Sequence, residues 1–423
     1  MTITFPYKGI SKEQFTLKAL AYAQSESHFA YYKSNGAEYP YGGFNEILAI
    51  GANSVLKPKG NSFQALKSFH DNEWCFGYLG YDLKNELENL SSENRDRTGF
   101  NNLEFFKAQS ILFFSEDECL IEGDVILEKI LISKLDQTVP QFKKPIASVQ
   151  KEEYIKTVES LQQHIKEGDC YEINYCQEFH GEIEQANPLN TFLVLNEVSP
   201  KPFTCFQKFN KHYILCASPE RFIKKEGTKI ISQPIKGTRP RGATPDEDLR
   251  LKTELRNDEK ELAENMMIVD LVRNDLAKTA KIGTVNVEEI FGIYSFEQVH
   301  QMISTVTGMQ REDKDFIDVI REAFPMGSMT GAPKIKVMEL IEEYENTKRV
   351  AFSGSSGYIT PDGDFDFNVL IRSLFLNTDL NTYSYQVGSA ITYDAIAENE
   401  YEECLVKARA ILKVLAHYNH EHK

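Results

Sequence analysis

Two pairs of glutamates have a spacing that could hold a metal ion. Glu261 and Glu264 lie three residues apart in one predicted helix, and Glu400 and Glu403 lie three apart in another. Residues at i and i+3 project from the same helix face, so each pair forms a local patch of negative charge. Two such patches facing each other require a cation between them, and Mg²⁺ prefers carboxylate oxygens. For either pair alone, a solvated helix surface is the simpler interpretation.

A lysine and a glutamate could supply covalent and acid–base chemistry. Lys236 follows an extended stretch and precedes Gly237, which lets a ligand or another backbone approach closely. Burial would lower the pKa of the lysine amine and free it to act as a nucleophile or base. Glu220, followed by Arg221, could be a general acid or base. The alternatives are a solvated lysine and a glutamate in an ordinary ion pair.

Two further features could bind an anion. Residues 327–334 form a glycine-containing loop that leads into a helix, and helix N-termini attract carboxylates. The loop lacks the spacing of a phosphate-binding P-loop, and a plain capped turn is its alternative interpretation. Arg372 lies in the apolar stretch 369–374, which predicts a buried strand. An arginine in such a strand needs a carboxylate partner from the protein or from a ligand.

The composition excludes several classes of function. The 423 residues include 63 acidic and 47 basic side chains, which give a formal net charge of −16. Nucleic acids and anionic membranes bind clusters of lysine and arginine, so neither is expected as a partner. No run approaches the roughly 20 apolar residues of a transmembrane helix, and the start has no secretory signal. The seven cysteines contain no C-x-x-C pair, which predicts reduced thiols in a cytoplasmic protein.

Periodicity and capping residues predict the elements that must position these side chains. Helices are expected at 154–165, ending near Gly168, and at 315–324 and 398–415. Three more are expected to begin after the caps Thr244 and Asp258 and at Pro333. Strands are expected at 111–114 and 125–132, and four more between 352 and 392. Strand-rich sheets with helices collected on one side indicate an α+β fold. The best boundary lies at 137–148, which holds two prolines.

Taken together, these segments resemble the chorismate-utilising enzymes, a family that includes anthranilate synthase component I, aminodeoxychorismate synthase component I, isochorismate synthase and salicylate synthase. The matching segments occur in family order at 168–174, 218–222, 234–242, 263–275, 327–334, 371–373 and 400–408. The resemblance is dense over 150–415 and thinner before it, where 77–83 match. It implies two packed, mostly antiparallel sheets flanked by helices, with an N-terminal segment at 1–140 and a chorismate-binding catalytic domain at 148–416 within one continuous body.

Within this family, the residue at position 236 indicates which reaction the enzyme catalyses. Residues 234–238 read Pro-Ile-Lys-Gly-Thr, which resembles the aminodeoxychorismate synthases, whereas the anthranilate synthases are similar but carry alanine in place of the lysine. The resemblance implies that ammonia replaces the C4 hydroxyl of chorismate with retention. Lys236 would attack C2 as the hydroxyl leaves, and ammonia would then add at C4 and expel the lysine. Anthranilate synthase component I and a chorismate-binding subunit without turnover are the alternatives.

The resemblance also implies a role for each site residue. Glu220 would protonate the departing hydroxyl. Glu264 and Glu403 would bind Mg²⁺ directly, and Glu261 and Glu400 would reach it through water. The positions implied to bind substrate are Arg372, Tyr358, Gly388, Lys407, Thr238, Ser328 and Thr330.

Three positions depart from the family pattern, and one of them, Asn265, replaces a histidine that is common in the family. Glu172 replaces the glutamine of aminating members and the lysine of hydroxylating members, which argues against isochorismate or salicylate synthase. Its carboxyl would be protonated or turned toward Lys236. Gln301 replaces a histidine near the ring carboxylate, which fits an enzyme that does not eliminate pyruvate. Because no glutaminase motif is visible, ammonia would come from a separate glutamine amidotransferase subunit in a heterodimer, or from free ammonium.

Overall fold

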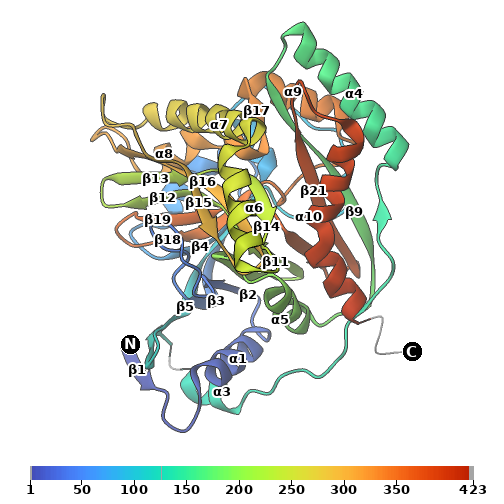
Figure 1. Cartoon of the computed structure of the whole chain (residues 1–423). Coiled ribbons are helices and arrows are strands. Elements are labelled where there is room, and N and C mark those ends of the chain that lie inside the picture. Colours follow the sequence, from blue (N-terminus) through green and yellow to red (C-terminus); the bar gives the residue numbers. More distant parts are fainter. Residues whose placement is uncertain (1, 125, 419–423) are drawn as a thin grey trace.

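The computed structural model describes residues 2–124 and 126–418 (Figure 1). Its helices are α1 (Lys12–Ala23), α2 (Ser62–His70), α3 (Leu127–Ile132), α4 (Lys151–Glu167), α5 (Pro188–Val198), α6 (Pro245–Asn257), α7 (Glu259–Ala277), α8 (Phe316–Ala323), α9 (Lys334–Tyr344) and α10 (Ala397–His417), with the short 3-10 turns η1 (Tyr81–Glu86) and η2 (Gly327–Met329). Its strands are β1 (Thr2–Pro6), β2 (His28–Lys33), β3 (Ile47–Leu56), β4 (Cys75–Leu79), β5 (Leu103–Phe114), β6 (Glu118–Gly123), β7 (Gln141–Phe142), β8 (Ile146–Ala147), β9 (Glu172–Gln185), β10 (Phe203–Phe209), β11 (His212–Ser218), β12 (Arg221–Glu226), β13 (Lys229–Gln233), β14 (Ile235–Pro240), β15 (Asn286–Ser295), β16 (Val299–Met309), β17 (Gly331–Ala332), β18 (Ser355–Ile359), β19 (Phe365–Asn368), β20 (Ser373–Asn377) and β21 (Thr382–Ile391).

The described strands join in one hydrogen-bonded antiparallel network, which confirms the α+β class. β10 lies between β2 and β11, and β11 continues to β20, β21 and β9. β12 pairs with β13 and β19, and β16 pairs with β13, β14 and β15. The N-terminal strands belong to the same network because β4 pairs with β18. In the segment 137–148, β7 and β8 both pair with β9.

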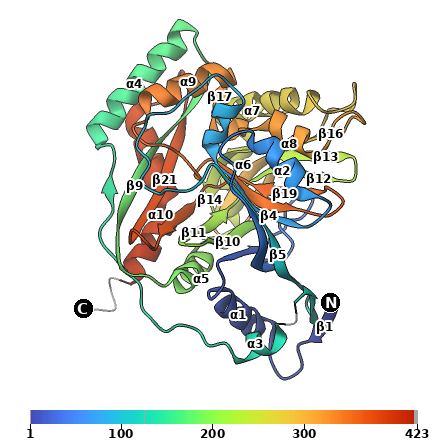
Figure 2. The same ribbon diagram turned by 180° about the vertical axis from the view of Figure 1, so that it is seen from behind.

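Alternating side chains of the central strands enter two different hydrophobic cores. On β2, Ala30 and Tyr32 belong to one core, whereas Phe29 and Tyr31 belong to the other. Successive strand residues point to opposite faces, so these strands are buried on both sides. The first core separates them from the second half of the network, including β12, β18 and β19, as in two packed sheets. The second core is covered by helices, with α4 and α10 lying over β9 and β21 (Figure 1, Figure 2).

Several helices begin and end as the sequence predicts. Gly168 ends α4 with a φ of +89°, the left-handed geometry that favours glycine. Asp258 caps α7, because its carboxylate accepts hydrogen bonds from the backbone N–H groups of Lys260 and Glu261. This cap fixes the first turn of α7 and therefore the positions of Glu261 and Glu264.

One predicted strand is wrong. Residues 127–132 form the helix α3, and Val125, at the start of that predicted strand, lies outside the described residues. In α3 only Ile130 is buried, and Ile132 is 77% exposed. The apolar run is too short for its periodicity to distinguish a helix from a strand.

Two other expectations concern the whole chain. Within residues 2–124 and 126–418, no helix combines the length and the hydrophobicity that crossing a bilayer requires. All seven cysteines are free and buried, as expected for reduced thiols.

A buried arginine links three elements next to the predicted site. Arg349 Nε lies 2.9 Å from Glu345 Oε2, and its Nη2 lies 2.6 Å from Glu345 Oε1. The guanidinium also donates to the carbonyl oxygens of Met329 (2.6 Å) and Asn174 (2.7 Å). The Arg349 and Glu345 side chains are only 1% and 2% exposed. Arg349 therefore holds the end of α9, η2 and β9 together.

We expect Arg349→Met to lower the free energy of unfolding by about 3–5 kcal/mol, because the carboxylate of Glu345 would stay buried without its partner. Urea unfolding measures this loss. The control is Arg250→Met, which removes an exposed ion pair with Glu254 on α6 and should change stability by less than about 1 kcal/mol. Equal losses in the two variants would contradict a linking role for Arg349.

Candidate active site

Lys236 and Glu172 form a buried ion pair at the centre of the candidate site. Lys236 lies on β14, Glu172 begins β9, and their side chains are 10% and 2% exposed. The ammonium of Lys236 donates to Oε1 of Glu172. Among the described residues, Oε2 of Glu172 has no hydrogen-bond partner. Of the two arrangements expected for Glu172, the structure has the carboxylate turned toward Lys236.

The charge state of Lys236 differs from the expectation. Burial alone would lower the pKa of its amine, as the sequence analysis assumes. The negative charges of Glu172, Glu264 and Glu403 outweigh burial and raise the pKa of Lys236 well above its usual value. The resting amine is therefore protonated, and it must lose that proton before it can act as a nucleophile.

Gly237 allows β14 to approach α7 closely. Its φ is +91°, a conformation that side chains other than glycine rarely adopt. A Cβ at this position would lie 3.0 Å from Leu255 Cδ1 and 3.1 Å from Glu261 Oε2. The glycine thus brings the strand that carries Lys236 against the first turn of α7.

The four glutamates expected to bind metal are matched by basic side chains of the chain itself. Arg239 Nη1 lies 3.0 Å from Glu261 Oε1. Lys407 Nζ lies 2.6 Å from Glu403 Oε1. Lys260 Nζ lies between the two helices, 3.7 Å from Glu264 Oε1 and 3.5 Å from Glu400 Oε1. Neither Lys260 nor Arg239 was expected in the site. The i, i+4 spacing of Lys260 and Glu264 is a local signal of the contact between these two side chains.

The donor set fits Mg²⁺, which commonly uses one or two carboxylates and keeps water or substrate oxygens. Glu264 is buried, and the free Oε2 of Glu172 is a further carboxylate oxygen without a partner in the described chain. Among the described residues, no three glutamates of this cluster have carboxylate oxygens that all lie within 4.8 Å of one another. His164, Glu167 and Asp169, which lie outside the cluster, do have ligand atoms this close together. Without rearrangement, an ion would therefore meet at most two carboxylates of the cluster directly.

The glutamates of the cluster have different pKa values. Burial raises the pKa of Glu264 to about 7, against the opposing charge of Lys236. Burial and the charge of Glu403 raise the pKa of Glu400. Glu403 is exposed, and although partial desolvation by its neighbours would raise its pKa, the nearby ammonium of Lys407 holds that pKa below its usual value.

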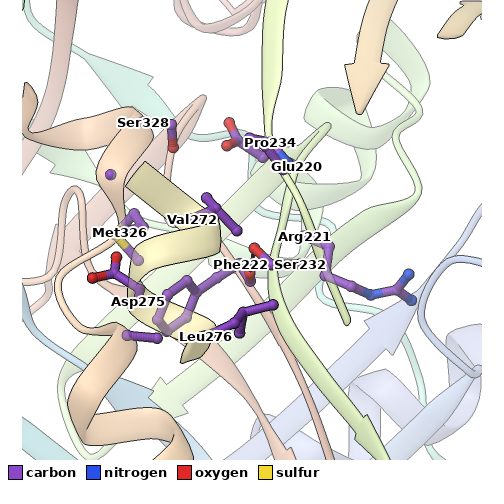
Figure 3. A pocket seen from close by; sticks show the side chains of 12 residues that line it. Glu220, Arg221, Phe222, Ser232, Pro234, Val272, Asp275, Leu276, Met326 and Ser328 are labelled. Carbon is purple, nitrogen blue, oxygen red and sulfur yellow. Dashed lines mark hydrogen bonds between the residues drawn. The ribbon is translucent and has the colours of Figure 1, made fainter. Parts of the chain in front are cut away.

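Glu220 is a buried carboxyl group with the properties of an acid or base. It lies between β11 and β12 and is 6% exposed. Burial raises its pKa to about 7, although a hydrogen bond with Ser328 and the charge of Lys236 favour the ionised form. Glu220 and Ser328 both line a small cavity beside α7 (Figure 3). A pKa near the working pH is the property that a general acid or base needs.

Arg372 is not in a strand, contrary to the expectation. It lies between β19 and β20 with a φ of +54°, and it is half-buried. Its Nη1 donates to the carbonyl oxygen of Lys407 (3.0 Å). No described carboxylate lies within 4.0 Å of its guanidinium, so the protein does not supply the anionic partner that the sequence analysis requires.

The loop at 327–330 brings Ser328 to the site but keeps Thr330 inside the fold. Asn174 of β9 donates to the carbonyl of Ser328 (2.8 Å), and its backbone N–H donates to the carbonyl of Thr330 (2.8 Å). The hydroxyl of Thr330 is fully buried and donates to carbonyls within the loop. Thr238 lies on β14 two residues beyond Lys236 and is exposed.

Gly388 and Lys407 lie together, whereas Tyr358 lies elsewhere. The ammonium of Lys407 donates to the carbonyl of Gly388 (2.8 Å), and a Cβ on Gly388 would lie 2.3 Å from Cys176 Sγ on β9. Tyr358 packs its ring against aromatic side chains of the first core: Tyr32, Phe44, Trp74 and Phe76. In the described chain it makes no contact with the cluster around Lys236.

Comparison with known proteins identifies the family. The family model for chorismate binding enzymes matches residues 7–413. The chain is 36% identical over 371 residues to the chloroplastic aminodeoxychorismate synthase of Arabidopsis thaliana, over 80% of this chain and 40% of that protein. It is 33% identical over 389 residues to anthranilate synthase component 1 of Acetivibrio thermocellus, over 85% of this chain and 78% of that protein. With aminodeoxychorismate synthase component 1 of Escherichia coli, it shares 39% identity over 64% of this chain and 59% of that protein.

Solved structures agree with this result. Anthranilate synthase component I from Streptococcus pneumoniae superposes with a TM-score of 0.74 at 25% identity, over 96% of this chain and 91% of that one. The menaquinone-specific isochorismate synthase of Escherichia coli has the same fold, with a TM-score of 0.78 at 15% identity, over 98% of this chain and 94% of that one. The chain therefore belongs to the chorismate-binding enzyme family. Because relatives with two different activities are 33–39% identical to it, membership alone does not specify the reaction.

The raised pKa of Glu264 predicts a pH-dependent effect of Glu264→Gln on stability. An unfolded glutamate loses its proton near its ordinary pKa, whereas the folded one keeps it to about 7. The folded state therefore binds more protons in this interval, and its stability falls as the pH rises through it. The glutamine variant lacks this loss. Between pH 5 and pH 8, we therefore expect its free energy of unfolding to rise by about 1–3 kcal/mol relative to that of the wild type.

Urea unfolding at both pH values, with EDTA present, measures this gain. The control is Glu259→Gln, which changes an exposed residue of α7 and should follow the wild type. A constant difference between Glu264→Gln and wild type at the two pH values would contradict the raised pKa.

Proposed function

We propose that the protein acts as an aminodeoxychorismate synthase component I and replaces the C4 hydroxyl of chorismate by ammonia. The observation that supports this most directly is Lys236, a buried lysine on β14 in contact with a carboxylate and within the electrostatic influence of Glu220. A covalent mechanism needs a nucleophile and an acid in one site, and these two residues fit those roles. Gln301, whose Oε1 is buried without a described partner, replaces the histidine expected in enzymes that eliminate pyruvate.

In the first half-reaction, Lys236 transfers a proton to Oε1 of Glu172, with which it is already in contact. The neutral amine then forms a bond to C2 of chorismate, the two ring double bonds shift, and the bond from C4 to oxygen breaks. Glu220 donates the proton with which the hydroxyl leaves as water. A pKa of about 7 keeps a substantial fraction of Glu220 protonated near neutral pH.

In the second half-reaction, ammonia forms a bond to C4 from the side that the hydroxyl left. The double bonds shift back, and the bond between C2 and the lysine nitrogen breaks. The amine leaves neutral and regains its proton from Glu172, and Glu220 accepts the proton released by the new ammonium group. Two displacements of this kind leave the new amino group on the original face of the ring.

The proposed reaction also requires a metal ion, residues that bind the substrate carboxylates, and a source of ammonia. Glu264 and Glu403, with Glu261 and Glu400 behind them, would hold Mg²⁺, which when bound neutralises charge and binds a substrate carboxylate. Arg372 would bind another carboxylate as a planar, bidentate donor. Ammonia would reach the site from a separate glutamine amidotransferase subunit or from free ammonium, and a lyase would act on the product to give p-aminobenzoate.

The test is incubation with chorismate, Mg²⁺ and ammonium, followed by mass analysis of the small molecules and of the protein. A stable amino-substituted chorismate supports the proposal. Fluorescent anthranilate with release of pyruvate would make the protein an anthranilate synthase, the activity that its Acetivibrio relative is named for. Binding of chorismate without turnover would make it a non-catalytic subunit.

We expect Lys236→Ala to reduce amination by about two orders of magnitude or more, because the nucleophile is lost. The control is Lys225→Ala, which removes another buried lysine, paired with Asp364 at 2.7 Å, and should leave the rate of product formation nearly unchanged. Product formation is followed by chromatography, and circular dichroism verifies that both variants fold. Undiminished amination by Lys236→Ala would exclude the covalent route.

Glu264→Gln should raise the Mg²⁺ concentration needed for half-maximal activity by about tenfold or more, because a charged oxygen ligand is lost. Titration of activity with Mg²⁺ measures the shift, and Glu259→Gln serves again as the control on the same helix. The same Mg²⁺ dependence in wild type and Glu264→Gln would exclude Glu264 as a ligand.

A further inference from the structure

One buried lysine in the described chain lacks an acidic partner. Lysine and arginine are rarely buried unless they are paired. Five of the six buried basic side chains follow this rule: Lys84, Arg221, Lys225, Lys236 and Arg349 each contact a carboxylate within 3.0 Å. The sixth, Lys201, is 8% exposed, and its ammonium makes neither a hydrogen bond nor an ion pair with any described residue.

The backbone around Lys201 is fixed, so this burial is built into the fold. Lys201 lies in the short segment between α5 and β10. Its carbonyl oxygen accepts hydrogen bonds from Asn35 Nδ2 (3.0 Å) and Thr204 Oγ1 (3.0 Å). The side chain of Asn35 is held in turn by Asn196 (2.9 Å). The backbone of Lys201 is therefore held in place, and its side chain starts from a buried position.

The charged groups that act on Lys201 include a second cation. Burial, together with the positive charge of Arg372, lowers the pKa of Lys201 to about 8, and the charge of Glu297 opposes this shift. Glu297 lies in the exposed turn between β15 and β16 and makes no contact with Lys201 within 4.0 Å in the part of the chain that the structure describes. The charge with the largest effect on Lys201 thus has the same sign as Lys201.

The sheet places Lys201 and Arg372 at the same end of three adjacent strands. Thr204 of β10 lies opposite Ala217 of β11, and the N–H of Ala217 donates to the carbonyl oxygen of Arg372 (3.2 Å), next to β20. Lys201 is three residues before Thr204. The guanidinium of Arg372 also lacks a carboxylate within 4.0 Å among the described residues. Both cations therefore lie at this end of the sheet without a carboxylate in contact among the described residues, and the charges of Glu403 and Glu220 act on Arg372 from beyond 4.0 Å.

We propose that Lys201 and Arg372 together bind one carboxylate of the substrate, which makes Lys201 a specificity-determining residue for an anionic substrate. This inference rests on the proposed function, and it adds a ligand contact that the sequence analysis did not identify. A guanidinium can donate two parallel hydrogen bonds to one carboxylate, and an ammonium adds a point charge from a third direction. The cost of burying the unpaired Lys201 is offset when that carboxylate is bound.

The test compares Lys201→Met, which keeps the length of the side chain but removes its charge, with Lys201→Arg, which keeps the charge. We expect Lys201→Met to raise KM for chorismate by about tenfold or more and to leave kcat within about threefold, because it removes one charged contact to the bound substrate. Calorimetric titration with chorismate should show the same loss of affinity. Lys201→Arg should keep most of the wild-type affinity for chorismate.

The matched control is Lys208→Met on β10. Lys208 is half-buried, and its ammonium donates to the carbonyl oxygen of Gln24 (2.6 Å), away from Arg372. This variant should keep the wild-type KM. An unchanged KM in Lys201→Met, or an equal rise in Lys208→Met, would overturn the proposal.

Stability gives a second readout that separates binding from a structural role. Because Lys201→Met removes an unpaired buried charge, the ligand-free variant should melt a few degrees above the wild type. A structural lysine would give the opposite result, so a lower melting temperature would also overturn the proposal. If the wild type neither binds nor converts chorismate, the proposed function fails. In that case malonate, a simple dicarboxylate, replaces chorismate as the probe, and it should stabilise the wild type more than Lys201→Met.

Discussion

The contact between Lys236 and Glu172 is the interaction on which the rest of the site depends. Either charge buried alone would cost several kcal/mol, so each requires the other. The two residues lie 64 positions apart in sequence and come from different strands, and Arg349 anchors the neighbouring segments of β9 and η2 through Asn174 and Met329. The antiparallel network thus keeps a proton donor and acceptor in contact in an environment with little water.

The candidate site is electrically divided. Carboxylates predominate around Lys236, where five glutamates gather from β9, α7 and α10. Lys201 and Arg372 lie before β10 and β20 without a carboxylate within 4.0 Å among the described residues, and Arg372 reaches α10 by donating to the carbonyl oxygen of Lys407. Such complementarity orients a bound molecule more than it tightens its binding.

The sequence alone predicts the features that depend on neighbouring residues. The ends of α4 and α7 follow from Gly168 and Asp258, because caps act within one turn of a helix. Prediction from the sequence fails where a conformation or a pKa depends on segments that are distant in the chain. The pKa of Lys236 rises through carboxylates from three other elements, and Arg372 adopts a left-handed conformation in an apolar run that resembles a strand. Tyr358 is drawn into an aromatic core that local pattern cannot reveal.

The basic side chains that accompany the acidic cluster have a consequence for how the protein matures. Arg239, Lys260 and Lys407 each neutralise a glutamate in the absence of any ion. Many small metallodomains, by contrast, fold only when the metal binds, because the binding free energy supplies the folding free energy. The proposed Mg²⁺ would therefore bind to a chain that is already folded, so that a chelator would empty the site without denaturing the protein.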